Sequence, residues 1–164
     1  MRHILLTIAL AFALAAPALA QKTAALDLSG TWILNPAKSK IDKHGTAGPE
    51  TIVINCSDSG IQMEITWTGG KESHTWIPDG KDHVRNQVRD QTAAGLLIEK
   101  AHWTKGVLVT ELISRVSMPG ASVDGYEPIH ATERWTLSAD GSTLTRNTDD
   151  PRQTLVYDKQ PPLQ

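Results

Sequence analysis

Short runs of alternating apolar and polar residues, separated by turn-forming residues, are the feature that most constrains the fold of this chain. From Ile61 to Trp67, for example, every odd-numbered residue is apolar and every residue between is polar. Since successive side chains of a strand point to opposite faces, such a run predicts a strand with one buried face. Similar runs recur from Gly30 onward, at a spacing of about 8–12 residues that is typical of an all-β sandwich or barrel.

The breaks between these runs predict antiparallel hairpins, because a parallel crossover needs about a dozen residues or more. They carry turn-forming pairs and triplets: Asp58-Ser59-Gly60, Gly69-Gly70, Pro78-Asp79-Gly80, Lys105-Gly106 and Asp140-Gly141. No later stretch shows a long 3.6-residue period, so we expect little helix. The predicted strands are 30–35, 50–57, 61–68, 72–77, 82–89, 95–104, 107–116, 128–137, 142–148 and 153–158.

Two longer connections, 36–49 and 117–127, interrupt this regular spacing. Long loops on a rigid scaffold are common places for lids and binding sites. They are also found as plain surface loops, and their length alone does not separate the two roles.

Residues 1–20 have the three parts of a secretory signal peptide. Arg2 and His3 form a basic start, an apolar run extends from Ile4 to Ala16, and Ala18-Leu19-Ala20 resembles a cleavage site. A retained membrane anchor is the alternative, but spanning a bilayer takes about 20 apolar residues. We therefore expect cleavage, a single domain over 21–164, and a location in the periplasm or outside the cell, without stable membrane insertion.

Composition excludes some classes of function. Without Arg2, the chain has 15 Lys and Arg against 18 Asp and Glu, and these charges are interspersed. This is not the basic surface that binds nucleic acid.

Cys56 is the only cysteine, so no disulfide forms within the chain. Since Cys56 continues an alternating apolar run, we expect a buried and unreactive thiol.

Aromatic residues are the first candidates for a ligand pocket. Trp76, Trp103 and Trp135 lie in predicted strands, and Tyr126 lies in the second long loop. Such side chains line apolar pockets, although as core residues they need no ligand.

Histidines are the candidates for a metal or haem site: His44, His74, His83, His102 and His130. No two of them are spaced two apart on one strand, and ligation needs several placed nitrogens. His74 shares a face with Trp76, and His130 with Arg134, which suits a solvated outer face. We therefore predict no metal and no cofactor.

Glu111 and Glu133 share faces with apolar residues. If those faces point inward, each carboxylate needs a partner such as Arg115, and the pair could orient a polar ligand head. The alternative, which we favour, is an exposed pair of Glu111 and Arg115 that contributes well under about 1 kcal/mol.

The opening Ser29-Gly30-Thr31-Trp32-Ile33-Leu34 resembles the G-x-W start of the calycins, which include the lipocalins and the fatty-acid-binding proteins. The resemblance implies an antiparallel up-and-down β-barrel of eight to ten strands. It also implies that Trp32 closes one end beneath a basic side chain from a late strand, either Arg134 or Arg146. The ending Val156-Tyr157-Asp158-Lys159 is similar to the last strand of fatty-acid-binding proteins, with Tyr157 in the corresponding place. Leu155 stands where those proteins have an arginine that helps bind a carboxylate.

The chain is also similar to a poorly characterised set of exported bacterial proteins. The shared segments are 29–40, 79–81, 137–145 and 156–160. These motifs are mostly structural and leave the activity open.

Catalytic signatures such as G-x-S-x-G, a P-loop and H-E-x-x-H do not occur in the sequence. We therefore predict an exported protein that binds a small hydrophobic or amphipathic ligand in a barrel cup gated by the two long loops. A filled barrel that binds a protein or a glycan is the alternative, and an enzyme with His and Glu at the barrel mouth ranks third. The predicted ligand-binding residues are Trp76, Trp103, Glu111, Tyr126 and Trp135. The predicted barrel-closing residues are Trp32, Arg134, Arg146 and Tyr157.

Overall fold

The computed structural model describes residues 26–41, 48–89, 93–117, 129–149 and 152–161. Within these ranges, only the backbone is described for 86–89, 93–95 and 115–117. Within these ranges all regular structure is β, in one antiparallel sheet with the order β4-β3-β2-β1-β10-β9-β8-β7-β6-β5. The strands are β1 (Gly30–Leu34), β2 (Glu50–Ser57), β3 (Gly60–Trp67), β4 (Gly70–Trp76), β5 (His83–Arg89), β6 (Ala93–Thr104), β7 (Val107–Ser117), β8 (Ile129–Leu137), β9 (Thr143–Asp149) and β10 (Arg152–Lys159).

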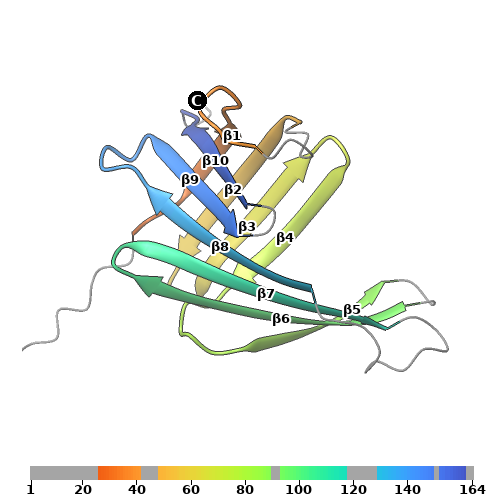
Figure 1. Cartoon of the computed structure of the whole chain (residues 1–164). Helices are drawn as coiled ribbons and strands as arrows, with labels where there is room; N and C mark the ends of the chain where they lie inside the picture. The colour runs from red at the N-terminus through yellow and green to blue at the C-terminus, as the bar shows by residue number, and fades with distance from the viewer. Residues whose placement is uncertain (1–25, 42–47, 90–92, 118–128, 150–151, 162–164) are drawn as a thin grey trace, which may run out of the picture.

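The sheet curls into a half-barrel, as Figure 1 shows. Strands that follow one another in the chain pair throughout, except β4 and β5. The first strand pairs with the last, with Trp32 opposite Lys159. β4 and β5 form the two ends of the sheet order and share no ladder. The up-and-down barrel predicted from the sequence is therefore confirmed, with an interruption between β4 and β5.

Tight turns explain why neighbouring strands pair. β6 and β7 are joined by Lys105 and Gly106, with φ values of +47° and +80°. Two consecutive residues with positive φ are typical of a type I′ turn, whose twist matches that of the flanking strands. Ten strands were predicted, and the observed bounds agree with the predicted bounds to within two residues at each end.

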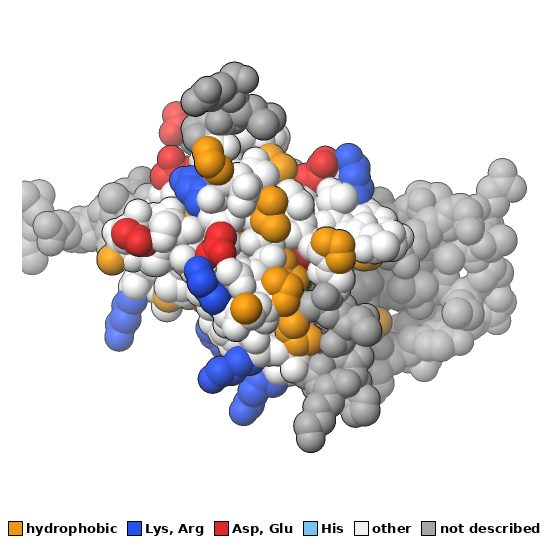
Figure 2. Space-filling view, turned by 90° about the horizontal axis from the view of Figure 1, so that it is seen from above, with side chains coloured by type: hydrophobic (Ala, Val, Ile, Leu, Met, Phe, Trp, Pro, Cys, Tyr) orange, Lys and Arg blue, Asp and Glu red, His pale blue; other side chains and the backbone are white. Residues whose placement is uncertain are grey.

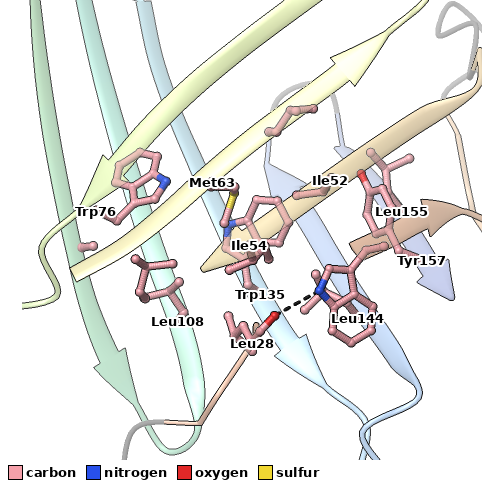
Figure 3. Close-up of a cluster of buried hydrophobic side chains, with 14 of the residues drawn as sticks. Leu28, Ile52, Ile54, Met63, Trp76, Leu108, Trp135, Leu144, Leu155 and Tyr157 are labelled. Carbon is pink, nitrogen blue, oxygen red and sulfur yellow. Dashed lines mark hydrogen bonds between the residues drawn. The ribbon is translucent and has the colours of Figure 1, made fainter. Parts of the chain in front are cut away.

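Apolar side chains from both halves of the curled sheet meet on its concave side (Figure 3). On β2 and β3 their burial follows the alternation in the sequence. The largest fully buried side chains are Trp32, Trp135, Tyr157, Leu28, Ile52, Ile54, Met63, Leu108, Leu144, Glu99 and Thr110.

Trp32 is wholly buried in the core, and its Nε1 donates to the carbonyl of Leu28 over 3.0 Å (dashed in Figure 3). The cation above its ring is Lys159, with Nζ 5.1 Å from the ring centroid. The assignment of this cation to Arg134 or Arg146 is therefore wrong. The reason is the β1–β10 register, which places Lys159 directly opposite Trp32.

Arg134 lies on the outer surface, where Nη1 contacts both carboxylate oxygens of Asp149 at 2.9 Å.

Seen from above, hydrophobic side chains on the surface are interspersed with charged and polar ones (Figure 2). In the part of the chain that the structure describes, no helix has the length and hydropathy needed to cross a membrane.

Of the two predicted gating loops, residues 42–47 of the first and 118–127 of the second lie outside the described residues. The beginning of the first loop, up to Ile41, is described and runs back along β10. There, Lys40 pairs with Thr154 through backbone hydrogen bonds of 2.7 and 2.9 Å.

Candidate functional site

A cavity of about 220 Å³ lies inside the curl of the sheet. Its walls come from β3 and β4 on one side and from β7, β8 and β9 on the other, so the curvature of the sheet creates it. One part of the wall is apolar and the other carries charged groups. The lining residues are Met63, Ile65, Glu72, His74, Trp76, Thr110, Leu112, Ala131, Glu133 and Arg146.

Arg146 on β9 is the centre of the first polar cluster. Its Nε donates to Oε1 of Glu133 over 2.9 Å, and Nη2 contacts the same oxygen. Its Nη1 lies 3.5 Å from Oε1 of Glu50. The guanidinium also lies over the ring of Trp135, 5.2 Å from the centroid. Because β8 and β9 place Arg146 opposite Trp135, the stacking follows directly from the register.

Burial opposes the charge of Arg146, but the carboxylates of Glu133 and Glu50 outweigh it and raise the pKa of Arg146 further. Arg146 is therefore a permanent cation. Tyr157 belongs to the same cluster, since its hydroxyl donates to Oε1 of Glu50 over 2.6 Å. Burial raises the pKa of Tyr157 above its usual value, so the phenol remains protonated and acts as a donor.

The second polar cluster joins the two ends of the sheet. His74 on β4 contacts Oε1 of Glu99 on β6 through Nδ1 at 2.9 Å. Arg85 on β5 contacts the other oxygen of Glu99 at 2.8 Å and donates to the carbonyl of Thr75 on β4 over 3.3 Å. Where β4 and β5 share no backbone ladder, side-chain contacts to Glu99 thus hold the barrel together.

Opposing effects act on His74. Burial disfavours its charged form, but the carboxylates of Glu72 and Glu99, 3.7 and 2.9 Å from its ring nitrogens, outweigh this and raise the pKa of His74 to about 9. The contact with His74 in turn lowers the pKa of Glu72. His74 is therefore an imidazolium at neutral pH, stacked on Trp76 with ring centroids 5.2 Å apart. Such a cation over an indole is stabilising.

Trp76 has a property that points to a ligand. Its side chain is 4% exposed and lines the cavity, yet its Nε1 has no hydrogen-bond partner in the part of the chain that the structure describes. A buried donor without a partner costs free energy on the order of 1–3 kcal/mol. By contrast, the indole of Trp135 donates to Oγ1 of Thr110 over 3.2 Å. An acceptor in the cavity would satisfy Trp76.

The arrangement suits non-covalent binding of a molecule with an apolar body and a polar end. The apolar wall removes hydrocarbon from water, and the polar wall orients a head group. Among the described residues, no three His, Cys, Asp or Glu side chains gather as a metal ion would require.

The residues predicted to bind a ligand lie at different places. Trp76 lines the cavity, and Trp135 lies beneath Arg146. Glu111 has the opposite parity on β7 from the lining residues Thr110 and Leu112, so it lies on the outer face. Tyr126 lies outside the described residues.

Trp103 lines a different and smaller pocket of about 120 Å³, together with Cys56 and Ile77. Its Nε1 is also buried without a partner. Cys56 is a free and partly buried thiol packed against the core.

Several functional residues differ from the sequence interpretation. The outer face expected for His74 and Trp76 is wrong, because both line the cavity, whereas His130 and Arg134 are exposed as expected. Glu133 pairs with Arg146, and the side chain of Arg115, the partner suggested from the sequence, lies outside the described residues. Glu50, Glu72 and Thr110 were missed. The alternation of Glu72, His74 and Trp76 on one face of β4 was the signal that could have indicated the second polar cluster.

No family model and no curated protein matches the sequence. Solved structures do resemble it. Fatty-acid-binding protein 1 of Echinococcus granulosus has a TM-score of 0.56 and 13% identity, over 83% of this chain and 100% of that chain. The REP1-NXSQ fatty acid transporter has a TM-score of 0.52 and 13% identity, over 84% of this chain and 98% of that chain. A point mutant of that transporter has a TM-score of 0.54 and 11% identity, over 82% and 98%. The similarity establishes a calycin-type fold.

Proposed function

We propose that this protein binds a small apolar or amphipathic molecule without covalent chemistry, in the cavity between β3, β4 and β7–β9. The observation that carries the proposal is the buried donor of Trp76, which lines a cavity with apolar and polar walls and has no hydrogen-bond partner among the described residues. The proteins that resemble it in fold are named as binding or transporting fatty acids, which supports a lipid-like ligand.

Intrinsic fluorescence tests the proposal, because Trp76 lines the cavity. We expect a saturable, one-to-one change when the chain is titrated with a panel of alkyl alcohols, isoprenoids, fatty acids and a hydrophobic dye. The change should be lost in Trp76→Phe. It should persist in Trp103→Phe, whose side chain lines the other pocket. A flat response across the panel contradicts the proposal and favours a surface that binds a protein or a glycan.

We further propose export with cleavage after Ala20. The support is the three-part pattern of residues 1–20 and the fact that all ten described strands lie between Gly30 and Lys159. Expression with the native N-terminus in a Gram-negative host, followed by fractionation and N-terminal sequencing, should give a protein that begins at Gln21 outside the cytoplasm. An uncleaved protein in the cytoplasmic fraction contradicts it.

A further inference from the structure

We infer that the cavity selects amphiphiles with an uncharged hydrogen-bonding head, such as an alcohol or a primary amide, over carboxylates with the same alkyl chain. This inference rests on the proposed function, since it names the class of ligand for the same cavity. Three observations carry it: the occupied guanidinium of Arg146, the charge balance of the polar wall and the buried donor of Trp76.

The guanidinium of Arg146 is the strongest anion-binding group on the cavity wall, and carboxylates of the protein already occupy it. Nε and Nη2 contact Glu133, and Nη1 lies 3.5 Å from Glu50. The face of the guanidinium lies over Trp135. Glu133 and Glu50 thus already balance the charge of Arg146. A carboxylate ligand that took over these contacts would displace one of them and leave that side chain as an unpaired buried anion, which is strongly unfavourable.

The charge balance of the two polar clusters points the same way. Three cations, Arg146, His74 and Arg85, face four carboxylates, and each cation contacts at least one of them. The carboxylates are Glu50, Glu72, Glu99 and Glu133. The two clusters thus carry one net negative charge before any ligand enters, and their members that line the cavity, two carboxylates and two cations, balance each other. In a partly buried site of low dielectric, another negative charge is repelled more strongly than in water.

Trp76 specifies what the head group must provide. Its Nε1 is a buried donor and needs an acceptor. A hydroxyl or amide oxygen provides one without a charge, and the O–H or N–H beside it can donate to a carboxylate oxygen of the polar wall. An uncharged head thereby satisfies Trp76 without opening the ion pairs of Arg146.

The volume of the cavity limits the ligand. A space of about 220 Å³ corresponds to about seven water molecules at about 30 Å³ each. We therefore expect a ligand with on the order of ten non-hydrogen atoms inside the curl, as in a medium-length alkyl chain with a small head.

The test is calorimetric titration of the chain with decanol, decanamide and decanoate at neutral pH, each below its aggregation limit. We expect decanol and decanamide to bind at least about tenfold more tightly than decanoate, and decanoate to gain affinity as acid neutralises it. Decanoate binding as tightly as decanol overturns this inference and leaves the proposed function standing. Failure of all three ligands to bind overturns the proposed function itself.

Variants locate the source of the selectivity. Glu133→Gln removes one of the two carboxylates that contact Arg146, so decanoate should gain about tenfold in affinity relative to decanol. The matched control is Glu64→Gln, which removes the same charge from an exposed pair with Lys71. Circular dichroism verifies that both variants are folded, and Glu50→Gln repeats the test if Glu133→Gln is not. An equal gain for decanoate in Glu64→Gln contradicts the role of Arg146.

Discussion

Lys159 lies over the ring of Trp32, with Nζ 5.1 Å from the centroid, because the pairing of the first and last strands places the two residues opposite each other. Gly30 makes room for this contact. An added Cβ at Gly30 would lie 2.8 Å from Cε of Lys159, and its φ of +147° is one that side chains rarely adopt. The G-x-W opening is thus explained by the geometry of the barrel end.

Trp32→Ala should lower the free energy of unfolding by about 3–5 kcal/mol, since a fully buried aromatic side chain is removed from the barrel end. Urea denaturation measures this loss. Trp67→Ala is the control, because Trp67 is 39% exposed. A loss below about 1 kcal/mol for Trp32→Ala would contradict the prediction that Trp32 closes one end of the barrel.

Gly30→Ala should destabilise the fold by about 1–3 kcal/mol through backbone strain and through displacement of Lys159. Gly141→Ala is the matched control, since Gly141 has a φ of +70° and no atom lies within 4 Å of the position of its added Cβ. If the contact with Lys159 matters, Lys159→Ala should cost less in the Gly30→Ala background than in the native chain. If Lys159→Ala lowers the stability equally in both backgrounds, the contact with Lys159 does not stabilise the fold.

Glu99→Gln should cost about 3–5 kcal/mol, because Glu99 is 1% exposed and its loss leaves His74 and Arg85 without their shared partner. Denaturant titration compares it with Glu64→Gln, an exposed pair expected to cost under about 1 kcal/mol. Similar costs for the two variants would show that Glu99 does not hold the ends of the sheet together.

His74 should make stability depend on pH. Its pKa rises from 6.5 to about 9 on folding, so the folded state binds the proton more tightly than the unfolded state. The stabilisation is therefore complete below pH 6.5 and is lost as the pH rises through 9. At 1.36 kcal/mol per pH unit, its upper limit is about 3 kcal/mol.

Denaturation midpoints below pH 6.5 and above pH 9 test this prediction. The native chain should lose more stability over that interval than His74→Gln does. The exposed His130 is the control, and His130→Gln should behave as the native chain. An identical pH dependence in all three proteins is the contradicting result.

The strands and turns could be predicted from the sequence because each depends on neighbouring residues. Alternation placed Met63 and Ile65 inside, and Lys105-Gly106 formed the expected turn. The pairing of β1 with β10 depends on residues more than a hundred positions apart, so spacing could not identify Lys159 as the cation over Trp32.

The polar wall was harder to predict for a related reason. The expectation that His74 lies outside assumed that an inward face is apolar, whereas here four charged side chains line the cavity with Trp76: Glu72, His74, Glu133 and Arg146. Their partners come from β2, β6 and β9, and those contacts exist only once the sheet has curled.

The most direct test of the central claim is calorimetric titration of decanol into the native chain and into Ala131→Phe, which places a phenyl ring in the cavity. The account predicts saturable one-to-one binding to the native chain and at least about a tenfold loss of affinity in the variant, with the fold retained by circular dichroism. Unchanged binding to a folded Ala131→Phe would contradict the account, because the ligand would then bind elsewhere.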